Sequence, residues 1–160
     1  MEIKLQKALE NVEMTYSDIV EIANDILSEF VKDVNDIIST ITSKEILTND
    51  EIRMYMLKLS CKAFSFSEVK EKSSMKAEIA EAIRKEKYAK TFNSIEGTVA
   101  FKENSSTIEI TNEILVECVH NLVSSLFKTK LDEIHRVVDT LRTILVSRNA
   151  EAKLSQDGLE

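Results

Sequence analysis

Proline is missing from this 160-residue sequence, and glycine occurs at only two positions, Gly97 and Gly158. Proline disrupts helix interiors and glycine costs about 1 kcal/mol there, so a chain nearly free of both has few of the usual breaks between helices. Tryptophan is also absent and aromatic residues make up only 6%, which leaves aliphatic side chains to form the core. Charged residues make up 31%, as expected for helices with one solvated face.

The two cysteines, Cys61 and Cys118, are too few for a disulfide framework and too isolated for a zinc site. We interpret them as half-buried thiols in a reducing compartment. No run approaches the roughly 18 consecutive apolar residues of a membrane span. The first residues also lack the apolar core of a signal peptide. These absences predict a cytoplasmic protein with no membrane partner.

Apolar residues recur at steps of three and four along most of the chain, the heptad pattern of helices that pack on one another. The first row runs from Leu5 to Phe30, shifts by one residue at Val34, and predicts a helix over about 3–42. Its flanking apolar residues widen the row beyond a two-stranded seam, which favours packing against two neighbours.

A second helical segment is predicted over about 49–94. It begins at a capping box in which Thr48 is the N-cap and Glu51 reaches back to it. The serines between Ser65 and Ser74 leave two alternatives open, one continuous helix or two kinked helices with a hinge.

A link over 95–111 is predicted next. Gly97 marks a helix C-cap or a short loop, residues 98–102 form either a helical turn or an extended link, and Asn104 to Thr107 reads as a turn. A last helix over about 112–149 follows with Thr111 as its N-cap, and the tail 150–160 is expected to fray. The chain is therefore predicted to form a single all-α domain over 1–160, an elongated antiparallel bundle or hairpin of coiled-coil-like helices.

The rows are wide for a lone chain, so self-association into a homo-oligomer is the expected way to bury them. The last helix supplies the expected contacts between subunits. These are Leu115, Val119, Leu122, Leu126, Leu131, Ile134, Val138, Leu141 and Leu145.

No constellation for catalysis is evident in the sequence. Cys118 and His120 are two residues apart, which places them on different faces of a helix. Glu113 and Glu117 share a face, and Glu117 could approach a lysine or arginine of a neighbouring helix. A metal-dependent bundle enzyme is the minor alternative, and we expect no enzyme activity, no metal site and no cofactor.

The charge is distributed unevenly. The net charge is −7, yet residues 58–102 carry 10 bases and 6 acids, whereas the segments on either side are acidic. The bases of this stretch interleave with aromatic residues, a pattern that can hold phosphates while rings stack on bases. Its candidate nucleic-acid-binding residues are Lys76, Arg84, Lys85, Lys87, Tyr88 and Lys90. The alternative is a solvated face on which Glu81 pairs with Lys85 and Glu86 with Lys90.

The stretch from Ala80 to Ser94 resembles the UvsY family of phage recombination mediators. In that family a central helix carries two bases one residue apart, followed by an aromatic residue and a small polar turn. Lys85 and Lys87 match the pair, and Phe92 and Ser94 match the aromatic residue and the turn. The order of elements over about 48–149 is also similar.

The resemblance implies a non-enzymatic oligomer that binds single-stranded DNA and helps load a RecA-type recombinase onto strands covered by single-strand-binding protein. Lys85 and Lys87, backed by Arg84 and Lys90, would contact phosphates, and a phage-encoded chain would act in the host cytoplasm. The rival hypothesis is a helical module that binds only proteins, such as a virion scaffold, a chaperone or an inhibitor of a host protein. The acidic first helix suits a basic partner.

Overall fold

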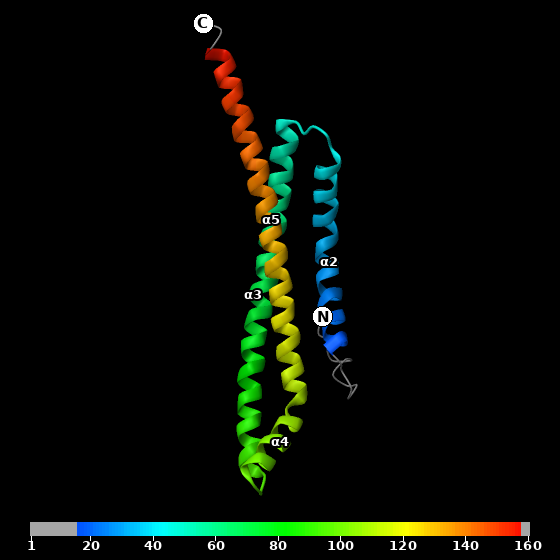
Figure 1. The fold of residues 1–160 in the computed structure, drawn as a ribbon, viewed down its shortest axis with the longest axis vertical. Helices are drawn as coiled ribbons and strands as arrows, with labels where there is room; N and C mark the ends of the chain where they lie inside the picture. The colour runs from blue at the N-terminus through cyan, green and yellow to red at the C-terminus, as the bar shows by residue number, and fades with distance from the viewer. Residues whose placement is uncertain (1–15, 158–160) are drawn as a thin grey trace. The chain divides into compact units, whose positions relative to one another are not determined.

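The computed structural model describes residues 16–157. Within this range the chain forms the helices α2 (Tyr16–Ser43), α3 (Asn49–Ser94), α4 (Val99–Glu109) and α5 (Thr111–Asp157), with no strand (Figure 1). The predicted all-α bundle of long helices is therefore confirmed. The expected start of the first helix near residue 3 lies outside the described residues.

The described residues form two compact units. Unit 1 contains residues 16–28 and 69–127, and unit 2 contains residues 29–68 and 128–157. Each unit therefore draws on α2, α3 and α5, whereas α4 belongs to unit 1 alone.

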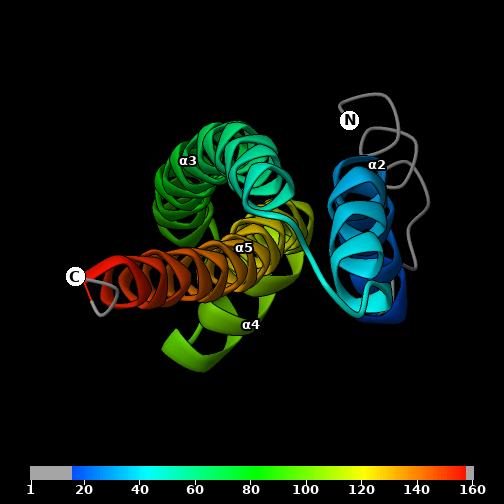
Figure 2. The same cartoon turned by 90° about the horizontal axis from the view of Figure 1, so that it is seen from above.

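Unit 1 has a core of small and β-branched side chains. Alanines on α2 and α3 allow close approach of neighbouring helices, and larger side chains from α5 fill the remaining space. Figure 1 shows the short α4 near the end where α3 stops and α5 begins, and Figure 2 shows α4 on the side of α5 away from α3. The buried apolar residues are Ile19, Ala23, Ile26, Ala77, Ala80, Ile110, Val119, Val123 and Phe127.

Unit 2 has a core with larger side chains. The Phe66 ring meets the Phe30 ring edge to face, with the ring centroids 6.3 Å apart. The buried apolar residues are Val34, Ile52, Tyr55, Leu59, Ala63, Phe66, Ile134, Val138 and Leu141. They come from the inner heptad rows of α2, α3 and α5, so the row spacing read from the sequence selects the buried face.

α3 is one continuous helix, so the serine-rich stretch does not interrupt it. Ser73 is buried and the Ser74 hydroxyl lies 2.7 Å from that of Ser124 on α5. These hydroxyls therefore pack within unit 1.

The predicted link over 95–111 is wrong for most of its length, because the helical turn expected as one alternative at 98–102 continues to Glu109 as α4. Thr98 caps this helix, with its hydroxyl accepting from the Phe101 amide at 3.4 Å. The turn expected from Asn104 to Thr107 is also wrong: the Thr107 hydroxyl donates to the Glu103 carbonyl at 2.8 Å, within the helix. Serine and threonine hydroxyls can thus bond to backbone carbonyls of their own helix without ending it.

The limits of α5 also differ from the prediction. Thr111 is its first helical residue, and its hydroxyl donates back to the Ile108 carbonyl at 2.8 Å instead of capping the first turn. The helix continues to Asp157, so the expected fraying from residue 150 is wrong within the described range. The added turns hold good helix formers such as Ala150 and Ala152 and contain no glycine before Gly158.

The capping box at the start of α3 is confirmed. The Thr48 amide donates to Glu51 Oε2 at 2.9 Å, and the Glu51 amide donates to the Thr48 hydroxyl at 3.2 Å. Lys44 also pairs with the Glu51 carboxylate. The Lys44 ammonium, followed by the two Thr48 donors, lowers the pKa of Glu51 to about 2.

This lowered pKa predicts an acid-dependent loss of stability. Because the folded state holds Glu51 below its ordinary pKa of 4.5, its contribution is complete above pH 4.5 and fades as the pH falls towards about 2. Urea midpoints of the wild type and of Glu51→Gln should therefore converge over this range. The side chain is solvent-accessible, so the difference should shrink in high salt. A constant difference down to pH 2 would contradict the assignment.

Candidate interaction surfaces

Two of the predicted DNA-binding residues instead connect α3 to α5 within unit 1. Arg84 Nε donates to Glu117 Oε2 at 2.6 Å, and Lys87 Nζ donates to Glu113 Oε1 at 3.0 Å. The Glu117 carboxylate raises the pKa of Arg84. The approach of Glu117 to a base on a neighbouring helix, expected from the sequence, is confirmed.

Two further bases of the predicted site, Lys85 and Lys90, lie on the exposed face of α3. Lys85 pairs with Glu81 at 2.5 Å and Lys90 pairs with Glu86, as the spacing of four residues predicted. These lysines lower the pKa of Glu81 and of Glu86. Exposed pairs exchange readily with solvent and are worth little, so both ammonium groups stay available to another anion.

The remaining two residues of the predicted site are half-buried. The pKa of His120 on α5 is lowered first by burial of its ring and then by the positive charge of Lys76. Tyr88 stacks on Phe92 with ring centroids 6.0 Å apart, and Lys102 Nζ lies 5.7 Å from the Phe92 centroid. The aromatic rings near the basic cluster therefore already contact each other and a lysine.

The nine residues expected to join subunits are divided between two environments. Val119, Ile134, Val138 and Leu141 are buried within their own unit. The other five are half-buried: Leu115, Leu122, Leu126, Leu131 and Leu145. The chain thus covers part of this row itself, and contact between copies through the rest stays a prediction.

Exposed apolar side chains concentrate on the outward face of α3, a surface that the heptad rows did not predict. In unit 2 they form the basic-flanked row Met54, Leu57 and Phe64, beside Arg53 and Lys58. In unit 1 they form the acidic-flanked ridge Met75, Ile79 and Ile83, beside Glu78. The sequence does contain a signal for these two surfaces, because several apolar residues of α3 fall outside its inner heptad row.

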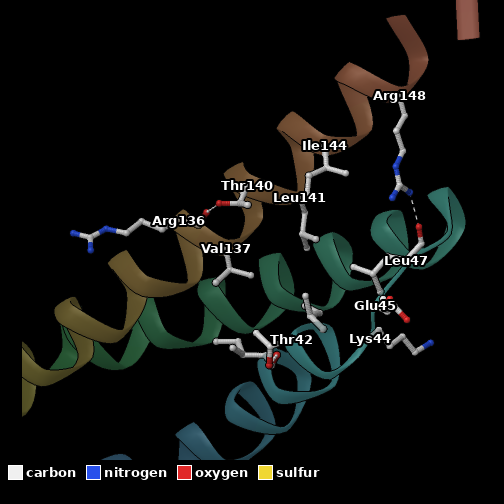
Figure 3. A pocket seen from close by; sticks show the side chains of 12 residues that line it. Thr42, Lys44, Glu45, Leu47, Arg136, Val137, Thr140, Leu141, Ile144 and Arg148 are labelled. Atoms are coloured by element: carbon white, nitrogen blue, oxygen red, sulfur yellow. Dashed lines mark hydrogen bonds between the residues drawn. The ribbon is translucent and has the colours of Figure 1, made fainter. Parts of the chain in front are cut away.

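A groove of about 420 Å³ lies in unit 2 between the end of α2 and α5 (Figure 3). Its apolar walls come from both helices and from the connection that follows α2. We call it the α2–α5 groove. Its lining residues are Ile38, Ile41, Thr42, Lys44, Glu45, Leu47, Arg136, Val137, Thr140, Leu141, Ile144 and Arg148.

The ion pair between Arg84 and Glu117 predicts a measurable coupling. Arg84→Ala leaves a half-buried carboxylate without its cation, and Glu117→Ala leaves the reverse, so each should lower stability. The double variant should lose less than the sum, with a coupling of about 1 kcal/mol after allowance for partial exposure. The same cycle at Lys85 and Glu81, which is more exposed, is the matched control. Equal couplings in the two cycles would contradict a bridging role for Arg84.

The described residues limit other kinds of site. Between Tyr16 and Asp157, no three histidine, cysteine or acidic side chains come together as a possible metal site. In the same part of the chain, no helix has both the length and the apolar composition to cross a membrane. No family model, curated protein or solved structure matches the chain. A function must therefore be inferred from these surfaces.

Proposed function

We propose that this protein is a non-enzymatic helical assembly module that works by binding proteins, beginning with copies of itself. The observation that carries the proposal is the apolar side chains exposed on α3. Phe64 and Leu57 in unit 2, and Met75 and Ile79 in unit 1, are each more than half exposed. Large apolar side chains grouped on a surface are typical of interaction sites.

The charge pattern favours proteins over nucleic acid as partners. Arg84 and Lys87 are engaged by carboxylates of α5, and the exposed Lys85 and Lys90 each have an acidic neighbour on α3. The chain as a whole carries a net charge of −7, which opposes approach to a polyanion.

Light scattering coupled to size exclusion, over a hundredfold range of protein concentration, tests the proposal. We expect a mass above that of one chain that falls on dilution, because assembly through exposed apolar surface follows mass action. A mass equal to one chain at every concentration would contradict it.

A second candidate is the oligomeric recombination mediator that binds single-stranded DNA and helps to load a RecA-type recombinase. What favours it is the pair of exposed ammonium groups on Lys85 and Lys90, which other subunits of an oligomer would repeat. In this case the phosphate contacts move from the Lys85 and Lys87 pair to Lys85 and Lys90, since Lys87 is engaged by Glu113.

Fluorescence anisotropy with a labelled oligonucleotide separates the two candidates. A mediator should bind with an affinity that falls steeply as salt is raised, and the double variant Lys85→Ala, Lys90→Ala should bind more weakly with a shallower salt slope. Glu103→Ala is a control that removes a charge elsewhere. Absence of binding by the assembled protein at low salt would remove this candidate and leave the first.

A further inference from the structure

We infer that the α2–α5 groove of one copy receives the acidic-flanked ridge of α3 from a second copy. The inference rests on the proposed self-association and names the two surfaces that would meet. One is concave and lined by apolar side chains with arginines, and the other is a convex apolar row beside an acid. A helix face seated in an apolar groove is a common mode of recognition between proteins.

The groove offers apolar walls and positive ends. Val137, Leu141 and Ile144 follow one another along α5 at spacings of four and three (Figure 3), and Ile38 and Ile41 of α2 also line the groove. This arrangement leaves a trough of the kind into which a row of helical side chains can pack.

Arg136 and Arg148 stand towards the two ends of the groove. Arg148 is half-buried and donates to the Leu47 carbonyl, whereas the Arg136 guanidinium has no partner among the described residues. In Figure 3 the Arg136 side chain extends away from α5. Lys44 is already paired with Glu51, and Glu45 is the acidic lining residue. Arg148 keeps its positive charge because its partner is a neutral carbonyl, and Arg136 is the arginine whose guanidinium is free to pair with an acid of a partner.

The ridge matches the groove in length and in chemistry. Met75, Ile79 and Ile83 are spaced four residues apart and are each more than half exposed. They span about 12 Å at 1.5 Å per residue, whereas Arg136 and Arg148 are separated by about 18 Å along α5. Three apolar side chains can therefore lie between the two arginines.

Charge selects this ridge over the other exposed row of α3. Glu78 lies next to Ile79 and has no partner among residues 16–157, so it is free to meet Arg136. The bases next to the ridge, Lys76 and Arg84, are engaged within the chain. The basic-flanked row of unit 2 would instead bring Lys58 towards an arginine. Repulsion between like charges disfavours the wrong pairing, and attraction between unlike charges favours the right one.

The groove and the ridge are different surfaces, so the contact is heterologous. Each copy that fills a neighbour's groove keeps its own groove available for the next copy. Assembly of this type continues until it closes into a ring or extends as a filament.

Charge reversal tests the pairing. Arg136→Glu should place two acids face to face across the contact, and Glu78→Arg should place two arginines face to face. Because like charges repel, each variant alone should associate at least about tenfold more weakly than the wild type. An equimolar mixture of the two should assemble again, because each contact between unlike variants joins an acid to an arginine. Lys58→Glu is the matched control on α3 and should assemble like the wild type.

Light scattering reads out assembly, and circular dichroism confirms that each variant is folded. Should a reversal unfold the chain, Arg136→Gln and Glu78→Gln give the same test with smaller effects. Wild-type assembly by both reversed variants, or failure of their mixture to recover, would overturn the inference while leaving self-association in place. A monomeric wild type would overturn both.

Discussion

Replacing Phe66 by alanine is expected to destabilise the protein by about 3–5 kcal/mol, the usual cost of deleting a phenylalanine from a packed core. The Phe66 side chain is 1% exposed and its ring packs edge to face on Phe30. Truncation removes this contact and leaves a cavity that the surrounding helices can fill only in part. The loss should appear as a lower midpoint of urea unfolding, measured at one fixed protein concentration because assembly adds to the apparent stability.

Phe64 provides a matched control on the same helix. It lies two residues away, its side chain is 76% exposed, and it borders a shallow groove shared by α3 and α5. Phe64→Ala should change the stability of the dissociated chain by no more than about 0.5 kcal/mol. Similar losses in the two variants would mean that the inner face of α3 has been assigned incorrectly.

This contrast shows which parts of the fold follow from the sequence. The inner heptad rows predicted the long helices, and Leu59, Ala63 and Phe66 are buried as their spacing indicated. The capping box predicted the start of α3 to the residue. Such features depend on the periodicity of one segment, which the sequence contains in full.

The segment from Thr98 to Ile110 could not be predicted in this way. Its serines and threonines are typical of turns, and its helical state depends on packing that the local sequence does not contain. Ser106 is buried within α4 and Ile110 is buried after it, although neither position stands out in the sequence. Tertiary contacts in unit 1 therefore override local preference here.

The candidate site was predictable only in part. The pairs of Lys85 with Glu81 and of Lys90 with Glu86 follow from spacing along one helix. The partners of Arg84 and Lys87 come from α5, and which turn of α5 lies beside α3 is set by the packed structure. A basic run therefore appeared as one cluster in the sequence, whereas two of its members hold the helices together.

Gly97→Ala should give the other large effect, a loss of about 1–3 kcal/mol. Gly97 has a φ of +131°, a conformation that side chains strongly disfavour, and it lies between the end of α3 and the Thr98 cap of α4. An added Cβ would also lie 3.1 Å from Phe101 Cδ1. The substitution would therefore disturb the entry into α4 and the packing of Ser106 within unit 1.

A double variant separates the two causes of this loss. Phe101 is largely exposed, so Phe101→Ala alone should cost little, and adding it to Gly97→Ala relieves the close contact without changing the backbone conformation. Because strain at positive φ is the larger effect, the double variant should recover less than half of the lost stability in urea unfolding. Glu96→Ala, the neighbouring exposed position, is the control and should stay within about 0.5 kcal/mol of the wild type. Full recovery in the double variant would show that contact with the Phe101 ring, and not the backbone of Gly97, requires glycine at this position.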